Sequence, residues 1–175
     1  MKDILIVVDM QNDFVDGSLG TKEAQEIVKN VVAKIEGFEG KIFATYDTHF
    51  ENYLETSEGK KLPVEHCIKG TPGWELNADV EAALAAKEDV TKIEKLTFGS
   101  VDLPGEIASY VGDDEFTVEL IGLCTDICVV SNALITKANY PEVKISVDSS
   151  CCAGVTPETH DAALTTMKMC QIDVI

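Results

Sequence analysis

Short apolar runs and longer amphipathic stretches alternate along the 175 residues of the chain. The run at residues 4–8 is continuously aliphatic, which is typical of a strand buried on both faces of a parallel sheet. Five further stretches have the length and apolar content of strands, namely residues 41–46, 90–95, 116–123, 143–147 and 172–175. The pattern therefore predicts six strands.

The amphipathic stretches between these runs predict helices. Thr21 can cap a helix in which Ile27, Val31 and Ile35 recur at helical spacing until Gly37 ends it. The other predicted helices span residues 77–86, 104–111, 125–139 and 157–169. This alternation predicts an α/β fold with three layers (α/β/α) and a six-stranded, mainly parallel, Rossmann-like sheet. The length indicates a single domain over residues 1–175.

A long polar connection at residues 47–73 interrupts the alternation, and loops of this length inside a compact domain are usually functional. In parallel α/β sheets, ligands bind beyond the carboxyl ends of the strands. The residues that end or directly follow each strand are therefore the first candidates for a site. They are Asp9, Asp47, His49, Lys95 and the segment 124–128.

Three of these strand ends carry a thiol, a carboxylate and an ammonium. Cys128 falls in the first turn of a predicted helix, where the helix dipole and free amides favour a thiolate, although most free cysteines are small buried hydrophobes. Asp9 suits a general base or a helix cap, and Lys95 suits either a solvated strand end or a cation that keeps Asp9 and Cys128 charged. Together they suit covalent acyl transfer by an activated cysteine.

A second group combines Asp47, His49, Glu58 and His66 around the long connection. Asp47 and His49 alternate at i and i+2, so an extended backbone can point both at one cation. A mixed set of nitrogen and oxygen ligands suits zinc, iron or manganese better than calcium. A polar loop with scattered histidines is the alternative interpretation.

The remaining unusual residues predict structural roles. We expect His160 to be a solvated residue in the first turn of its helix, and Trp74 to pack in the core. Cys151, Cys152 and Cys170 have no neighbour in the sequence that would activate them.

The charge of the chain limits the classes of partner that it can bind. It has 31 acidic and 14 basic residues, a formal net charge of −17, and every basic residue is a lysine. This balance predicts no nucleic-acid partner and no anionic membrane partner. Without arginine, a substrate with several carboxylates would lack a bidentate partner. No apolar run reaches the ~18–20 residues of a membrane span, and no Cys-x-x-Cys pair occurs. We expect the first ten residues to form a strand rather than a signal peptide, and therefore expect a cytoplasmic protein with reduced thiols.

Three blocks of the sequence resemble the signature blocks of the isochorismatase-like cysteine hydrolases. They are residues 9–14 (Asp-Met-Gln-Asn-Asp-Phe), 95–100 (Lys-Leu-Thr-Phe-Gly-Ser) and 122–128 (Gly-Leu-Cys-Thr-Asp-Ile-Cys). Within that family, Asp-Thr-His at 47–49 and His-Cys-Ile-Lys-Gly-Thr-Pro-Gly at 66–73 resemble the nicotinamidase branch.

The resemblance implies a role for each matching residue. Asp9, Lys95 and Cys128 would form the catalytic triad. The peptide bond between Leu123 and Cys124 would be cis, and the amides of Cys124 and Cys128 would form the oxyanion hole.

The same resemblance implies that Asp47, His49, Glu58 and His66 bind a divalent metal, zinc first and iron or manganese as alternatives. It also implies that Phe14 lines the substrate pocket.

The implied activity is metal-assisted hydrolysis of a small carboxamide, nicotinamide to nicotinate and ammonia, through a thioester on Cys128. Alternatives are an amidase for a carbamoyl compound such as N-carbamoylsarcosine, an isochorismatase, and a non-catalytic binding or redox-sensing domain. The expected partner is a small-molecule amide, and a homo-oligomer is a further possibility.

Overall fold

One six-stranded sheet forms the centre of the computed structural model, which describes residues 1–175. The strands lie in the order β3-β2-β1-β4-β5-β6, and all five pairings are parallel. Their bounds are Lys2–Val8 (β1), Lys41–Asp47 (β2), Val90–Lys95 (β3), Phe116–Leu123 (β4), Lys144–Ala153 (β5) and Asp173–Val174 (β6). The predicted fold class is confirmed.

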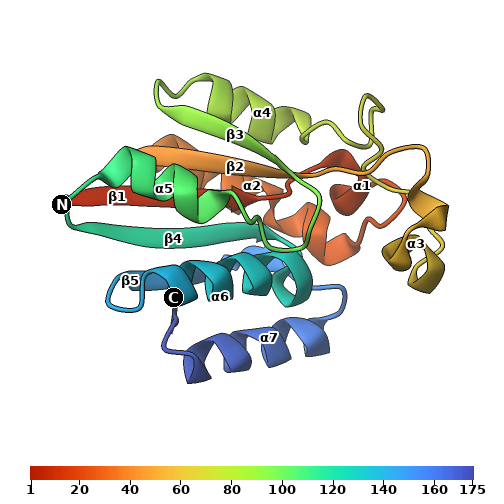
Figure 1. The fold of residues 1–175 in the computed structure, drawn as a ribbon. Helices are drawn as coiled ribbons and strands as arrows, with labels where there is room; N and C mark the ends of the chain where they lie inside the picture. Colours follow the sequence, from red (N-terminus) through yellow and green to blue (C-terminus); the bar gives the residue numbers. More distant parts are fainter.

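Helices cover both faces of this sheet and form the two outer layers (Figure 1). Helices α2 (Lys22–Gly37) and α4 (Ala78–Ala85) pack on one face, around side chains such as Leu5 and Val7 of β1. Helices α5 (Leu103–Val111), α6 (Val130–Asn139) and α7 (Pro157–Met169) pack on the other face, around Ile4 and Ile6. Strand β1 alternates its side chains between two buried layers, which explains its continuously apolar sequence.

The order of the strands in the sheet determines where a ligand site is expected. The chain builds outward from β1 through β2 to β3 and then returns to the other side of β1 as β4. The carboxyl ends of β1 and β4 therefore flank the point where the strand order reverses, which is where open α/β sheets bind ligands. In Figure 1 the strands point to the right, toward α1 (Asn12–Val15) and α3 (Ser57–Lys61).

The long connection after β2 contains short helices that the sequence pattern did not predict. A 3₁₀ turn, η1 (Tyr53–Glu55), leads directly into α3. Thr56 joins the two by accepting a hydrogen bond from the Gly59 amide at 3.0 Å. Gly59 is required here because a Cβ atom would lie 2.1 Å from the Tyr53 carbonyl oxygen.

Strand β5 is longer than predicted, because it continues past residue 147 to Ala153. The polar residues 148–150 ended the predicted strand, but Asp148 is buried and pairs with Lys34 of α2 at 2.8 Å. The predicted helix at 125–139 also differs: its first turn, η2 (Thr125–Val129), is π-helical and precedes α6. No helix is both long enough and apolar enough to cross a membrane.

Candidate active site and metal centre

Asp9, Lys95 and Cys128 converge at the carboxyl edge of the sheet. Asp9 directly follows β1 with φ of 45°, Lys95 ends β3, and Cys128 lies in η2 after β4. The Lys95 Nζ atom lies 2.7 Å from Asp9 Oδ2 and 3.5 Å from Cys128 Sγ. All three side chains are buried, so this charged group is held away from bulk water.

Two residues that the sequence did not single out hold the three in place. Thr45 of β2 donates a hydrogen bond to Asp9 Oδ1 at 2.7 Å. Asn132 of α6 donates to the Cys128 carbonyl at 2.8 Å and accepts the Ser100 amide at 2.8 Å, so it joins the cysteine turn to the loop after Lys95. The only sequence signal for Asn132 was a polar residue within the helix predicted at residues 125–139.

Burial opposes the thiolate form that the helix dipole would favour at Cys128. Burial, reinforced by the Asp9 carboxylate, raises the pKa of Cys128 well above its ordinary value, and Lys95 offsets only part of this. Burial also raises the pKa of Asp9, against the opposing effect of Lys95.

The turn that leads to Cys128 begins with a cis peptide bond between Leu123 and Cys124. The Cys124 N–H donates to no other group of the protein. Gly122, with φ of 115°, lies so close to β1 that a Cβ atom would be 2.1 Å from the Val8 carbonyl oxygen. The start of the cysteine turn thus lies directly against the end of β1, the strand that Asp9 follows.

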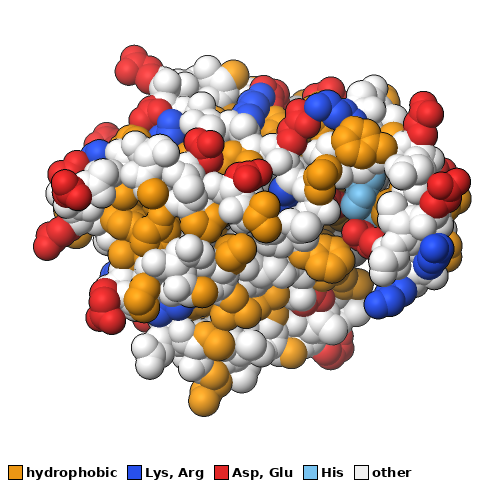
Figure 2. Space-filling view, viewed as in Figure 1, with side chains coloured by type: hydrophobic (Ala, Val, Ile, Leu, Met, Phe, Trp, Pro, Cys, Tyr) orange, Lys and Arg blue, Asp and Glu red, His pale blue; other side chains and the backbone are white.

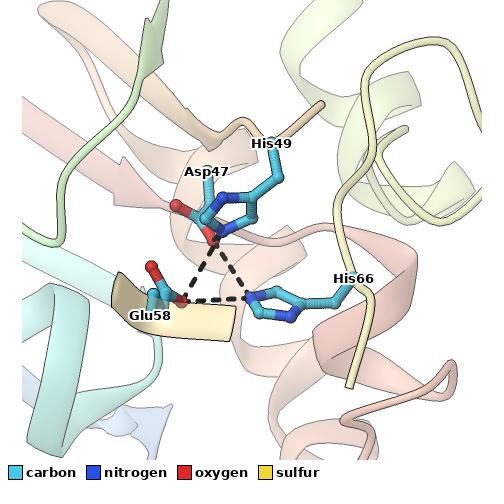
Figure 3. A group of neighbouring side chains, drawn as sticks. All are labelled: Asp47, His49, Glu58 and His66. Atoms are coloured by element: carbon cyan, nitrogen blue, oxygen red, sulfur yellow. Dashed lines mark hydrogen bonds and ion pairs between the residues drawn. The ribbon is translucent and has the colours of Figure 1, made fainter. Parts of the chain in front are cut away.

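The four predicted metal ligands also come together, although they belong to separate segments. Asp47 ends β2, His49 follows two residues later, Glu58 lies on α3 and His66 lies in the loop beyond it. Figure 3 shows the four side chains pointing toward a common centre. One donor atom from each residue lies within 4.8 Å of the others.

The spacing of these donor atoms fits a small divalent cation. The Nε2 atoms of His49 and His66 lie 3.6 and 3.5 Å from Glu58 Oε1, and 3.0 and 3.5 Å from Asp47 Oδ2. Four ligands about 2.0–2.2 Å from a tetrahedral metal lie about 3.3–3.6 Å apart. Two imidazoles and two carboxylates are also a donor set that zinc, iron and manganese accept.

The two carboxylates of this cluster favour a positive charge within it. Burial disfavours a charged His66, but hydrogen bonds with Asp47 and Glu58 raise its pKa to about 10. Burial likewise opposes a charged Asp47, but His49, His66 and Lys95 hold its pKa well below the usual range. His66 Nδ1 donates to the Val64 carbonyl at 2.8 Å, which leaves Nε2 as the ligand atom.

The segment after β1 fixes the metal cluster as well as the triad. Gln11 accepts the Asp47 amide at 2.7 Å and donates to the Asp47 carbonyl at 2.8 Å. Asp13 accepts the amide of Cys67, next to His66, at 2.8 Å. Lys95 Nζ lies 3.4 Å from Asp47 Oδ1 and so links the two groups.

A cavity of about 450 Å³ opens onto both groups. Its buried part includes Cys128, His66 and Phe14, and the predicted position of Phe14 agrees with this lining. Its outer part is apolar and exposed, with Leu62, Leu96 and Phe98. Figure 2 shows a histidine at the bottom of a hollow, with hydrophobic side chains around it.

The structure also tests the roles predicted for other residues. Trp74 packs against the core, and its Nε1 donates to Thr48 at 3.0 Å. The six cysteines form no disulfide, and Cys151 and Cys152 are buried. His160, however, is not simply solvated: it is partly buried, and its Nδ1 lies 2.7 Å from Thr125 Oγ1.

Comparison with known proteins agrees with this architecture. A nicotinamidase/pyrazinamidase of Mycobacterium tuberculosis is 26% identical over an alignment of 192 positions, gaps included, that covers 98% of this chain and 97% of the relative. An Arabidopsis thaliana protein described as a probable inactive nicotinamidase is 30% identical over 184 residues, 94% of this chain and 87% of the relative.

A solved structure agrees over the full length. The pyrazinamidase of Pyrococcus horikoshii in complex with zinc superposes with a TM-score of 0.83 at 28% identity, over 100% of this chain and 99% of that one.

A parallel sheet with a cysteine, a lysine and an aspartate buried at its carboxyl edge defines the class as an α/β enzyme. The isochorismatase domain matches residues 3–175, and the chain belongs to this family, in its nicotinamidase branch.

Proposed function

We propose that the protein is a cysteine amidohydrolase that converts nicotinamide to nicotinate and ammonia through a thioester on Cys128. One observation carries the proposal: Lys95 lies within 3.5 Å of both Asp9 and Cys128, and the cavity that reaches Cys128 also reaches the four-residue cluster around Asp47. The nucleophile and members of the metal-binding set therefore face one substrate-sized space, and the cation that contacts the nucleophile also contacts the base.

The first half of the reaction forms the thioester. Asp9 takes the proton from the Cys128 thiol as Sγ attacks the carboxamide carbon. This proton transfer accompanies the attack. Lys95 stays protonated and balances the charges, since Asp9, Cys128 and Asp47 raise its pKa against the effect of burial.

The first half ends when the tetrahedral intermediate collapses: the C–N bond breaks, ammonia leaves and the thioester remains on Cys128. The N–H groups of Cys124 and Cys128 stabilise the oxyanion, and Asp9 returns its proton to the departing ammonia. A water molecule then attacks the thioester carbon while Asp9 takes its proton, and the Cys128 thiol is restored as nicotinate leaves.

Asp47, His49, Glu58 and His66 would hold the metal, zinc in the first place, because their donor chemistry and spacing fit it. The bound cation would supply a Lewis-acid contact for the pyridine nitrogen and so help to orient the ring.

The shape and charge of the cavity support a small neutral amide. Phe14 and Phe98 provide aromatic surface for a planar ring, and no arginine exists to bind a dicarboxylate. This disfavours isochorismate as the substrate.

The test is ammonia release from nicotinamide in a coupled assay, with and without a chelator. Wild-type protein should release ammonia, and Cys128→Ala should release none while its circular dichroism and melting temperature stay close to those of wild type. Cys170→Ala is the matched control, because this cysteine is exposed and lies outside the cavity. Quenched mass spectrometry should detect the nicotinoyl group on Cys128.

Two results would overturn the proposal in different ways. Substantial turnover by Cys128→Ala would exclude the thioester. Release from N-carbamoylsarcosine but not from nicotinamide would keep the amidase and replace the substrate, and no release from any amide would favour a non-catalytic role.

A further inference from the structure

His160 makes a contact that the proposed reaction does not use. Its Nδ1 atom lies 2.7 Å from the hydroxyl of Thr125, which is fully buried. Thr125 is the first residue of η2 and follows Cys124 directly, so it sits between the two amides assigned to the oxyanion hole. His160 itself does not line the cavity.

A second contact joins the same two segments. The Asp126 carboxylate accepts the Val155 N–H at 3.1 and 3.2 Å, just before the start of α7. Two consecutive residues of the cysteine turn are therefore bonded to the junction between β5 and α7. The turn has a fixed external support as well as its own backbone hydrogen bonds.

The segment that supports the turn, from Gly154 to His160, is closely packed. Gly154 packs so tightly on His160 that a Cβ atom would lie 2.8 Å from the His160 backbone nitrogen. The strand before it pairs Cys152 with Gly122 and Ala153 with Leu123, so β5 holds α7 in register with the end of β4. His160 is thus held by its packing on Gly154, at the end of a strand that pairs with β4, as well as by its contact with η2.

We propose that His160 is a positioning residue for amide hydrolysis. Through the Thr125 hydroxyl it fixes the orientation of η2, and with it the Cys124 N–H and the Cys128 thiol relative to Asp9. This inference rests on the proposed function. Misplacing a nucleophile or an oxyanion donor by a fraction of an ångström lowers the rate of the chemical step more than it weakens substrate binding.

The test compares four variants in steady-state kinetics. His160→Ala and Thr125→Val should each lower kcat about 10- to 100-fold while KM changes by less than about threefold. His160→Asn, whose amide can occupy the place of Nδ1, and Thr125→Ser, which keeps the hydroxyl, should recover to within about threefold of wild type. The double variant His160→Ala/Thr125→Val should be no slower than the worse single variant, because both remove one contact.

Thr159→Ala is the matched control. Thr159 is exposed, belongs to the capping box of α7 with Thr156, and has its side-chain hydrogen bonds with Thr156 rather than with η2. This variant should lower the melting temperature without lowering kcat. If it lowers kcat as much as His160→Ala, or if His160→Ala leaves kcat unchanged, His160 has a structural role only and the proposal fails.

Hydrogen exchange separates this inference from the proposed function. The amides of residues 124–129 should exchange faster in His160→Ala than in wild type, and His160→Asn should restore the slow rate. If wild-type protein hydrolyses no amide but exchange behaves in this way, the proposed function fails and the support of η2 by His160 stands. Unchanged exchange would overturn the positioning role.

Discussion

Lys95 is the residue on which both halves of the site depend. Its Nζ contacts Asp9, Asp47 and Cys128, and its side chain is 1% exposed. In Lys95→Met the Asp9 carboxylate keeps its burial and loses its counter-ion, which costs about 3–5 kcal/mol of unfolding free energy. We expect ammonia release to fall by at least about 10²-fold. Chemical denaturation and the coupled assay measure the two effects.

Lys92→Met is the control for this prediction, because Lys92 lies on the same strand and pairs with Glu81 at 2.6 Å. Both of those side chains are nearly half exposed, so the loss should stay within about 0.5 kcal/mol with normal activity. Equal effects from the two variants would contradict the central role of Lys95.

At this scale the sequence predicted which residues meet at the site but not their surroundings. Asp9, Lys95 and Cys128 could be selected because parallel strands bring their carboxyl ends to one edge. The burial that raises the pKa of Cys128 and the contact of His160 with Thr125 depend on distant segments, which no local pattern contains. The contact of Thr45 with Asp9 was not predicted for the same reason, since in the sequence Thr45 is an ordinary strand residue.

At the scale of elements, α3 is the short helix that brings Glu58 to the metal centre. Gly59 packs against the carbonyl of Tyr53, and Gly59→Ala would push α3 away from η1. We expect this variant to bind zinc at least about tenfold more weakly, because the loss of one carboxylate ligand reduces affinity for the cation. Isothermal titration calorimetry with zinc measures the change.

Gly105→Ala in α5 is the matched control, since a Cβ atom there meets nothing within 4 Å. It should leave zinc affinity unchanged and stabilise the fold by about 0.5–1 kcal/mol. Normal zinc binding by Gly59→Ala would show that the position of α3 does not control the metal centre.

The elements also show what the hydrophobic pattern can and cannot predict. Strands β1, β2 and β4 were predicted because they are largely apolar runs between helices, whereas β3 has only two apolar residues, Val90 and Ile93. The end of β5 was missed because Asp148 and its neighbours are polar, and Lys34, which neutralises Asp148, lies on a helix more than a hundred residues earlier. Helices α1 and α3 and the turn η1 are too short to show helical periodicity.

At the scale of the whole molecule, the metal centre should contribute to folding stability. The ligands come from β2, α3 and the following loop, so a cation that binds only the folded chain ties these segments together. At a free zinc concentration 100 times the Kd, the expected gain is about 2.7 kcal/mol, and a chelator should reverse it. Thermal denaturation should show the shift in wild type and little in His66→Ala. A melting temperature independent of zinc in wild type would contradict a metal site.

The charge of −17 makes the few lysines important for stability near neutral pH, and Lys34 shows how. It pairs with Glu119 at 2.7 Å and with Asp148 at 2.8 Å, between α2 and the sheet. Burial opposes ionisation of Asp148, but Lys34 and Ser150 hold its pKa below the ordinary value. A carboxyl whose pKa is lowered by folding adds stability above its unfolded pKa of about 3.9, and this stability disappears as the pH falls through the folded value.

Lys34→Met should therefore be less stable than wild type by about 1 kcal/mol near pH 7, and the difference should shrink as the pH falls below about 4. Urea denaturation at a series of pH values and constant ionic strength measures it. Lys22→Met is the control, because Lys22 and Glu26 form an exposed pair at 3.4 Å whose loss should matter little at any pH. If the deficit of Lys34→Met persisted unchanged in acid, it would come from lost packing of the lysine side chain against α2 and the sheet, and the charge would not be its cause.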